Sequence, residues 1–525
     1  MHTVDHIQKI IYRLSKPVHV LGRESGFEFS NDPLDLPRSE RDLPKAFAPA
    51  LPMENLGDPE FKTRHGLKYA YVAGAMANGI SSTDMVKAMA ENGMVGFFGA
   101  GGLGLDRINE AAIDLKTQLK DRPFGFNLIH NLSDPDHEMA TVKLYLDHGI
   151  RLVSAAAFMR MTPALVYYRV KGIRRGADNE IIIPNRIMAK VSRIEVARQF
   201  FSPPPEKILA TLVESGLITL EEAKLAGHIP MAHDLTAEAD SGGHTDNRPA
   251  LALLPTMISL KNEFMEKFRY QSPLCVGLAG GIATPESVCA AFNMGASYVL
   301  TGSVNQSCVE AGISQEVKKL LCQAQQADVA MAPAADMFEI GARVQVLKRG
   351  TMFPVRAEKL YRVYQGHDDF GQVPRNMRKE IEEKFLKTDF ESAWQSTRNF
   401  FAGQNNTKEI IKAESNPKHK MALVFRSYLG QSSRWAIQAV PDRKMDYQIW
   451  CGPAMGAFNQ WARSSFLESH ENRNTPEIAL NLMFGACAFS RVIFLKTQNV
   501  TLPHKACYFR PMGKDRILEF NLGLI

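Results

Sequence analysis

The feature that most constrains the fold is a regular alternation of short apolar runs and helix-length segments between residues 68 and 303. The runs are rich in Val, Ile, Ala and Gly, which is typical of parallel strands covered on both faces. They number eight and lie at residues 68–76, 94–100, 124–130, 151–157, 186–192, 234–240, 274–280 and 297–303. Eight such units predict an α/β fold, a (β/α)8 TIM barrel with its active site at the carboxyl ends of the strands. A doubly wound open sheet is the alternative.

Regions outside this alternation predict additions to a barrel of residues 68–303. Residues 193–232 are too long for one crossover helix and contain a Pro triplet, so they predict an inserted helical subdomain. Residues 304–525 hold all four tryptophans and are expected to form a mainly helical accessory region. Residues 1–67 are expected to be an N-terminal segment and linker, because 31–60 is Pro-rich and lacks periodicity.

Charge and cysteine usage exclude several classes of protein. The net charge of +6 is spread thinly, which argues against nucleic-acid binding. The seven cysteines form no CxxC pair, as expected for a reduced cytoplasmic protein without a structural metal. No apolar run approaches the ~20 residues that a membrane helix needs, and the N-terminus lacks a signal-peptide core. We therefore expect a cytoplasmic protein that binds neither nucleic acid nor membrane.

Two glycine loops follow the last two predicted strands. They are GLAGGIATPES (277–287) and GASYVLTGSVNQ (295–306), each running into a predicted helix. Backbone N–H groups in front of a helix N-terminus form an anion site, and barrels commonly bind phosphate after strands seven and eight. Each loop alone also suits an ordinary turn in which glycine allows a positive φ. The pair, in this order, favours phosphate.

A third glycine loop, FFGAGGLGLDRINEA (97–111), ends the second predicted strand. It resembles a dinucleotide-binding fingerprint, but the acidic residue expected about twenty positions later is absent. We interpret it as backbone that approaches a flat ligand closely.

The segment EADSGGHTD (238–246) places a histidine on two glycines directly after the sixth predicted strand. Histidine can donate or accept a proton at neutral pH, and Gly242 and Gly243 allow a sharp turn. His244 by itself also suits a capping or solvated loop residue. Glu238 and Asp240 lie on one face of an extended strand, either as hydrogen-bond acceptors near the site or as solvated carboxylates.

Taken together, these motifs carry a family resemblance. GAMANGIS (74–81), GFFGAGGL, PFGFNLIH, EADSGGHTD and AGGIATPESVCAAFNMGASYVLTGS resemble the flavin-dependent nitronate monooxygenase and enoyl reductase superfamily of barrels. Within it, IMAKVSRIEVARQFF, EADSGGHTDNRP and VQVLKRGTMFPVRAEKLY are similar to the enoyl reductase subunit of bacterial polyunsaturated fatty acid synthases and to trans-acting enoyl reductases of polyketide synthases. The resemblance covers nearly the whole chain.

The resemblance implies an FMN at the top of the barrel, with NAD(P)H as reductant. Its contacts would come from four groups of residues: Gly280, Gly281, Gly302 and Ser303 at the phosphate; Ala75, Met76 and Ala77 along the isoalloxazine edge; Asn127 at the ring or ribityl chain; and Gly242 and Gly243, which would bring His244 over the flavin. His244 matches the family's active-site histidine. Nitronate monooxygenases usually have Pro where this chain has Ala75. Lys190 is a candidate for the flavin N1–O2 region, or a lysine whose amine reaches water from a strand end.

The implied activity is reduction of the 2,3 double bond of enoyl thioesters carried by an acyl carrier protein. The alternatives are a nitronate monooxygenase-like oxidase and a non-catalytic scaffold that binds phosphate. The basic segment 344–366 is interpreted as a helix with a solvated basic face, or as a collar that steers the acidic carrier to the barrel mouth. The apolar tail, including LNLMFGACAFSRVIFL, predicts a homodimer.

Overall fold

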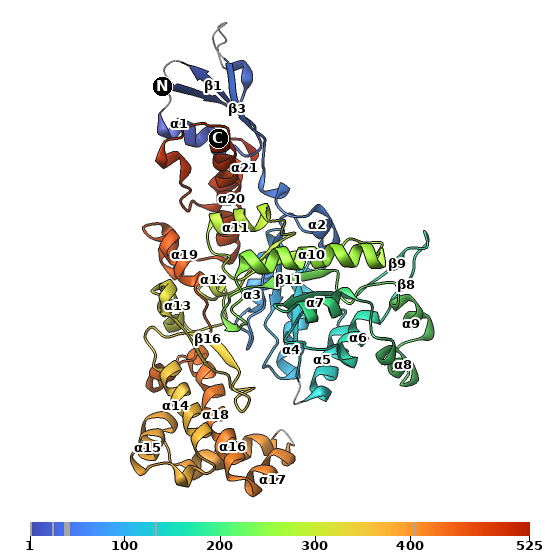
Figure 1. The fold of residues 1–525 in the computed structure, drawn as a ribbon, viewed down its shortest axis with the longest axis vertical. Helices are drawn as coiled ribbons and strands as arrows, with labels where there is room; N and C mark the ends of the chain where they lie inside the picture. Colours follow the sequence, from blue (N-terminus) through green and yellow to red (C-terminus); the bar gives the residue numbers. More distant parts are fainter. Residues whose placement is uncertain (1–2, 24–25, 36–42, 132–133, 404–405) are drawn as a thin grey trace. The chain divides into compact units, whose positions relative to one another are not determined.

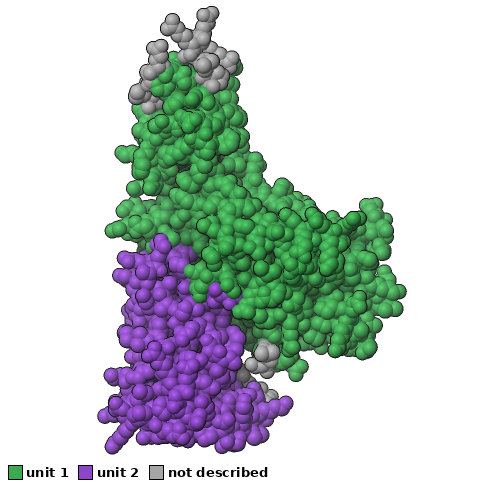
Figure 2. All heavy atoms as spheres, in the orientation of Figure 1, with its two compact units in different colours: residues 1–240, 247–312, 457–525 green, residues 241–246, 313–456 purple. Residues whose placement is uncertain are grey.

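The chain divides into two compact units (Figure 2). The computed structural model describes residues 3–23, 26–35, 43–131, 134–403 and 406–525. The first unit comprises residues 1–240, 247–312 and 457–525, and the second comprises 241–246 and 313–456. The second unit therefore consists of one long stretch and a six-residue segment taken from the middle of the first.

The first unit contains a closed barrel of eight parallel strands (Figure 1). Each strand falls inside the range expected from the sequence: β4 (Tyr71–Ala73), β5 (Val95–Phe98), β6 (Gly125–Ile129), β7 (Leu152–Ala156), β10 (Arg186–Val191), β11 (Asp234–Glu238), β13 (Cys275–Ala279) and β14 (Val299–Thr301). The order β10-β11-β13-β14-β4-β5-β6-β7 closes on itself. The (β/α)8 barrel is therefore confirmed, and the open sheet is wrong.

Helices follow the strands, and four of the eight begin at a residue whose side chain caps the helix. They are α3 (Thr83–Glu91), α4 (Leu105–Leu119), α5 (Pro135–Asp147), α6 (Pro163–Val170), α7 (Ile194–Phe201), α10 (Ala250–Phe268), α11 (Pro285–Asn293) and the short α12 (Ser303–Gln306). Ser82 caps α3, and Thr284 and Ser287 form a capping box at α11. These caps satisfy N–H groups that the helices cannot pair internally.

Two insertions interrupt the barrel around β10. A small hairpin of β8 (Arg174–Arg175) and β9 (Ile181–Ile182) precedes it. Between β10 and β11, α7 is followed by α8 (Glu206–Glu214) and α9 (Leu220–Ala226), which confirms the inserted helices. The hairpin was not predicted, because its two-residue strands carry no periodic signal.

The amino-terminal end of the barrel is closed by α2 (Pro59–His65) and a buried ionic cluster. Phe61 stacks on Tyr298 with ring centroids 4.1 Å apart. Asp234, the first residue of β11, accepts from Arg64 Nη1 at 2.6 Å and pairs with His65 Nε2 at 2.9 Å. This end lies opposite the carboxyl ends of the strands, so the cluster is part of the scaffold.

The N-terminal segment packs with the C-terminal helices of the same unit. It forms α1 (Val4–Tyr12) and an antiparallel sheet of β1 (Val18–Arg23), β2 (Gly26–Ser30) and β3 (Leu43–Ala48), in the order β2-β1-β3. Strand β3 lies within the Pro-rich stretch 31–60, which shows no periodicity in the sequence and was expected to act as a linker. From α20 (Thr475–Thr497), Arg491 donates to the carbonyls of Ile11 at 2.6 Å and Arg13 at 3.0 Å. Figure 1 shows α1 and the C-terminal end of the chain close to α20 and α21 (Lys514–Leu522).

Helix α20 explains the most apolar run of the tail. It is long and apolar enough to cross a membrane, with a mean hydropathy of 1.9, contrary to the expectation that no run reaches this length. However, 78% of its most apolar window is buried inside the structure. It is therefore accounted for as a core helix packed beside α11, and its apolar run gives no separate support for a homodimer.

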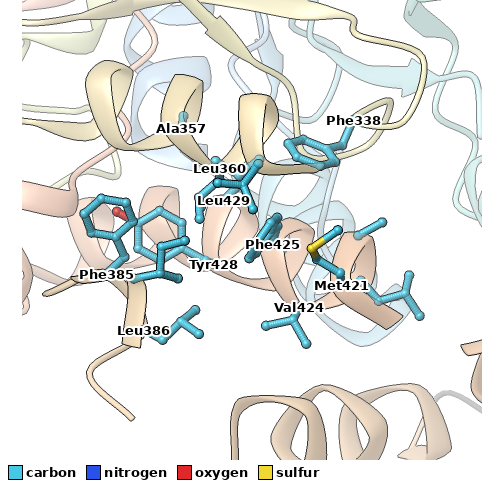
Figure 3. Close-up of a cluster of buried hydrophobic side chains, with 14 of the residues drawn as sticks. Phe338, Ala357, Leu360, Phe385, Leu386, Met421, Val424, Phe425, Tyr428 and Leu429 are labelled. Carbon is cyan, nitrogen blue, oxygen red and sulfur yellow. The ribbon is translucent and has the colours of Figure 1, made fainter. Parts of the chain in front are cut away.

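The second unit combines a small sheet with a helical core (Figure 3). Its antiparallel sheet has the order β12-β16-β15, formed by β12 (Gly243–His244), β15 (Val329–Pro333) and β16 (Arg343–Leu347). The helices are α13 (Gln315–Cys322), α14 (Phe353–Gly366), α15 (Arg375–Glu380), a π-helical turn (Ile381–Leu386), α16 (Phe390–Gly403), α17 (Thr407–Ser415) and α18 (Pro417–Gln438). Phe338, Leu360, Phe425 and Tyr428 meet in its core. The tail is thus mainly helical, but 344–366 is a strand followed by a helix, not one helix.

Candidate active site at the carboxyl end of the barrel

Strand β6 presents Asn127 to the interior of the barrel near its carboxyl end. Phe126 packs on Tyr145 of α5, outside the sheet, so the alternating residues Asn127 and Ile129 face inward. Asn127 is 5% exposed, and its Oδ1 accepts a hydrogen bond from the N–H of Gly101 at 3.0 Å. The side-chain oxygen of Asn127 is therefore bonded to the loop after β5.

The loop after β4, which carries Ala75, Met76 and Ala77, is fastened to the loop after β5. Met76 donates its N–H to Ser81 Oγ at 3.1 Å, and its carbonyl accepts from Ser81 N. A Cβ on Gly99 would lie 1.8 Å from the Met76 carbonyl oxygen. Gly99 is therefore required by contact between two loops. The expectation that this backbone also approaches a flat ligand stays a prediction.

Lys190 and Glu238 form an ion pair on neighbouring strands. Lys190 Nζ lies 2.8 Å from Glu238 Oε1, with side chains 18% and 19% exposed. Strands β10 and β11 are paired in parallel, and both residues lie near their carboxyl ends. Of the two carboxylates singled out in the sequence, Glu238 therefore joins the candidate site. Asp240 instead accepts from Asn247 Nδ2 at 2.8 Å.

The two glycine loops end the adjacent strands β13 and β14. Gly280 has a φ of +84°, and its Cβ would lie 2.6 Å from the carbonyl carbon of Ala239, so only glycine fits. Gly281 and Gly302 differ, because a Cβ on either would meet open space. Neither of their N–H groups has an acceptor among the residues that the structure describes. Ser303 follows Gly302 as the first residue of the short helix α12.

The segment Ser241–Asp246, which carries His244, belongs to the second unit. Gly243 and His244 pair with Gln345 and Val344 of β16. Gly243 has a φ of +81°, while a Cβ on Gly242 would lie 2.9 Å from the N atom of Cys451. Both glycines are thus required locally, one by its φ and the other by close packing.

The imidazole of His244 faces a carboxylate that sequence reasoning missed. Its Nε2 lies 3.2 Å from Asp336 Oδ2, in the turn between β15 and β16. Partial loss of water around the Asp336 carboxylate would by itself raise its pKa, but the hydrogen bond and charge of His244 and two backbone N–H groups together hold the pKa below its usual value. Asp336 follows His244 by about ninety residues in the chain, so no local spacing in the sequence could have revealed the pair.

A second histidine was also missed, at the end of β6. His130 Nδ1 lies 2.9 Å from Oε2 of Glu138, a residue only 3% exposed. Glu138 also accepts from the N–H of Asn131 and from Thr162 Oγ1, the cap of α6. His130 ends the quoted motif PFGFNLIH, so its position after a barrel strand was the available signal.

The structure therefore brings most of the expected residues together at one end of the barrel. Those in the first unit are Ala75, Met76, Ala77, Asn127, Lys190, Gly280, Gly281, Gly302 and Ser303. Gly242, Gly243 and His244 lie in the second unit, on a segment that follows Asp240 in the chain. Among the described residues, no three His, Cys, Asp or Glu side chains group as metal ligands.

Comparison with known proteins relates both units to biosynthetic enzymes. The chain is 38% identical to the enoyl reductase domain of MlnA from the macrolactin biosynthesis cluster of Bacillus amyloliquefaciens, with a TM-score of 0.81, covering 86% of this chain and 100% of that domain. Residues 367–447 match the family model of the inserted helical domain of [acyl-carrier-protein] S-malonyltransferase.

Two curated relatives are longer proteins. The polyketide biosynthesis protein PksE of Bacillus subtilis is 47% identical over 431 residues, covering 82% of this chain and 56% of the relative. A component of the polyunsaturated fatty acid synthase of Thraustochytrium is 43% identical over 448 residues, covering 84% of this chain and 30% of the relative. The chain thus spans about half or less of these relatives. It belongs to the family of enoyl reductase domains found in polyketide and polyunsaturated fatty acid synthases.

Proposed function

We propose that the chain is an FMN-dependent enoyl reductase that reduces the 2,3 double bond of enoyl thioesters on an acyl carrier protein, using NAD(P)H. The supporting observation is the set of donors and charges at the carboxyl end of the barrel, in a chain similar to a whole enoyl reductase domain. The relatives act in polyketide biosynthesis and polyunsaturated fatty acid synthesis, which suggests the same setting here.

The residues of the barrel end fit FMN. Gly281 and Gly302 have N–H groups with no acceptor among the described residues, and open space at the position of a Cβ, which suits a phosphate. Asn127 has an amide N–H to donate, and Lys190 supplies a positive charge held by Glu238. Ala75, Met76 and Ala77 would lie along the ring, where the small side chains of Ala75 and Ala77 and the backbone allow close approach. When bound, FMN supplies the hydride that reaches the β-carbon of the substrate.

His244 supplies the proton in this proposal. Hydride addition at the β-carbon leaves an enolate, which must gain a proton at the α-carbon. A protonated imidazole can donate that proton and recover it from water. Gly242 and Gly243 hold the backbone of the segment, and their replacement would move the imidazole.

The carrier protein remains a proposed partner, but the contacts within the second unit do not support the basic collar. Arg349 pairs with Asp328 at 3.2 Å and Lys359 with Glu380 at 2.6 Å. Arg356 pairs with Asp446, which is 1% exposed. The cations of 344–366 are thus largely matched by acids from elsewhere in the unit. Carrier recognition and a homodimer are inferred from the synthase relatives alone.

The visible spectrum of the purified protein and rapid mixing test the proposal. We expect flavin absorption, bleaching by NADPH without oxygen, and recovery of the colour on addition of an enoyl thioester. Recovery with oxygen but not with the thioester would indicate the oxidase instead. A colourless protein that takes up no FMN would indicate the scaffold.

A further inference from the structure

One hairpin of the second unit holds the backbone around His244. Strand β16 pairs with β12 on one side and with β15 on the other. Gln345 of β16 is 5% exposed and donates from Nε2 to the carbonyl of Ser241 at 2.8 Å. A Cβ on Gly452 would lie 2.8 Å from the N atom of Gly242, so the segment is also packed closely from this side. The path of residues 241–244 is therefore set within the second unit.

The same hairpin supplies the carboxylate that meets the imidazole. Asp336 lies in the turn between β15 and β16, and its Oδ2 is 3.2 Å from His244 Nε2. A single element thus fixes both the backbone of His244 and one nitrogen of its ring. A carboxylate on one ring nitrogen orients an imidazole and favours its charged form.

The contact contributes little to the stability of the fold. The side chains of His244 and Asp336 are 47% and 61% exposed. Ion pairs of this exposure are weak because water and salt screen them. The stability of the fold therefore does not explain why Asp336 lies beside His244.

We propose that Asp336 is a positioning residue for His244, orienting the imidazole and stabilising its protonated form before the proton moves to the α-carbon of the substrate. This inference rests on the proposed function. In the step, the bond between the proton and the ring nitrogen breaks as the C–H bond at the α-carbon forms. The imidazole becomes neutral, and Asp336 stays ionised and transfers no proton.

Other charged groups near the imidazole are unchanged by a substitution at Asp336. Asp246 lies two residues further along the segment. Arg343 precedes Val344 of β16, and its guanidinium lies 3.0 Å from Glu358 Oε2. The effect of Asp336→Asn on the titration of His244 therefore reports the loss of one carboxylate charge.

The test is a double-mutant cycle of Asp336→Asn and His244→Ala in the FMN-loaded protein. We expect Asp336→Asn to lower kcat for enoyl reduction about tenfold or more, as for other partners that orient a functional histidine, with KM little changed. In the His244→Ala background the same substitution should have no further effect. Asp336→Glu should restore part of kcat. Unchanged kcat in Asp336→Asn, or an equal further loss in the His244→Ala background, would overturn the inference.

A matched control and a second measurement separate this inference from the proposed function. Glu339→Gln removes a carboxylate from the same turn, but one bonded to Arg426 at 3.1 Å, and should keep full activity. Magnetic resonance of labelled histidines, with His244 assigned from His244→Ala, measures its pKa without any substrate. We expect a lower pKa in Asp336→Asn than in the wild type. An unchanged pKa of His244 in Asp336→Asn would overturn the pairing, even if the protein reduced no enoyl thioester. If His244→Ala lost activity while Asp336→Asn kept the wild-type kcat, only the positioning role of Asp336 would be overturned.

Discussion

Gly280 and Gly281, which follow β13, differ in the space that the structure leaves for a side chain. Gly280 is excluded from carrying a side chain by the carbonyl groups of Ala239 and Asp240. Gly281 has a φ of +76° but open space at its Cβ position. A Cβ at Gly281 therefore meets no atom of the described residues within 4 Å, and a substitution there tests whether a ligand occupies that space.

We expect Gly281→Asp to purify with much less FMN than the wild type, because its carboxylate would face the phosphate at close range. Gly281→Asn is the matched control, since it has nearly the same size, tolerates a positive φ and carries no charge. The measurement is the ratio of flavin to protein absorbance after gel filtration. Equal flavin content in the two variants would show that this loop does not hold the phosphate.

At the same scale, His244→Ala should keep its FMN and its reduction by NADPH but lose enoyl reduction by roughly 10²–10⁴-fold, the usual contribution of a general acid. Separate rates for bleaching and for recovery of the flavin colour check this. Recovery at the wild-type rate would remove His244 from the mechanism.

At the scale of secondary-structure elements, Asp234 joins β11 to α2. Its carboxylate is 1% exposed and lies within 2.9 Å of Arg64 and His65. Burial alone would raise the pKa of Asp234, but the charges of His65 and Arg64 outweigh it and hold the pKa well below its usual value. The ionised group therefore stabilises the fold near neutral pH.

Asp234→Asn should destabilise the protein by about 3–5 kcal/mol at pH 7, because it removes the buried carboxylate charge that Arg64 and His65 share. The pKa of Asp234 is depressed on folding, so its contribution is complete above the unfolded value near ~3.9 and is lost as pH falls below it. The difference between wild type and variant in urea midpoint should therefore shrink below about pH 4. Glu60→Gln, at an exposed partner of Arg64, is the control and should change little. A difference that is independent of pH would contradict this account.

Segment 344–366 shows where element prediction failed. Its first residues, VQV, alternate apolar Val344 and Val346 with polar Gln345, a strand pattern too short to compete with the helical pattern that follows. No pattern in the sequence indicated that the cations of this segment are paired, because the acidic residues that pair with Arg349, Arg356 and Lys359 lie far along the chain or on other elements. Spacing along a sequence reveals neighbours on one element only.

For the whole molecule, we expect carrier-bound enoyl chains to be reduced with a higher kcat/KM than short free thioesters. Acyl carrier proteins are acidic and this chain has a net charge of +6, so the advantage should fall as salt rises. Steady-state rates for both substrates over a range of ionic strength test this. Equal values and equal salt dependence would indicate that the carrier itself is not recognised.

The sequence by itself determined the barrel, its eight strands and the loops that end them, because apolar periodicity, caps and glycines act over a few residues. It also placed Asn127, Lys190, Gly281 and His244 on strand ends or on the loops that follow them. Only the tertiary structure decided that Lys190 meets Glu238, that Gly242 packs on Cys451 and that His244 meets Asp336. It also decided that the most apolar helix of the tail lies inside the first unit. These outcomes depend on groups far apart in the chain, whose meeting is set by how the elements pack and not by the pattern within any of them.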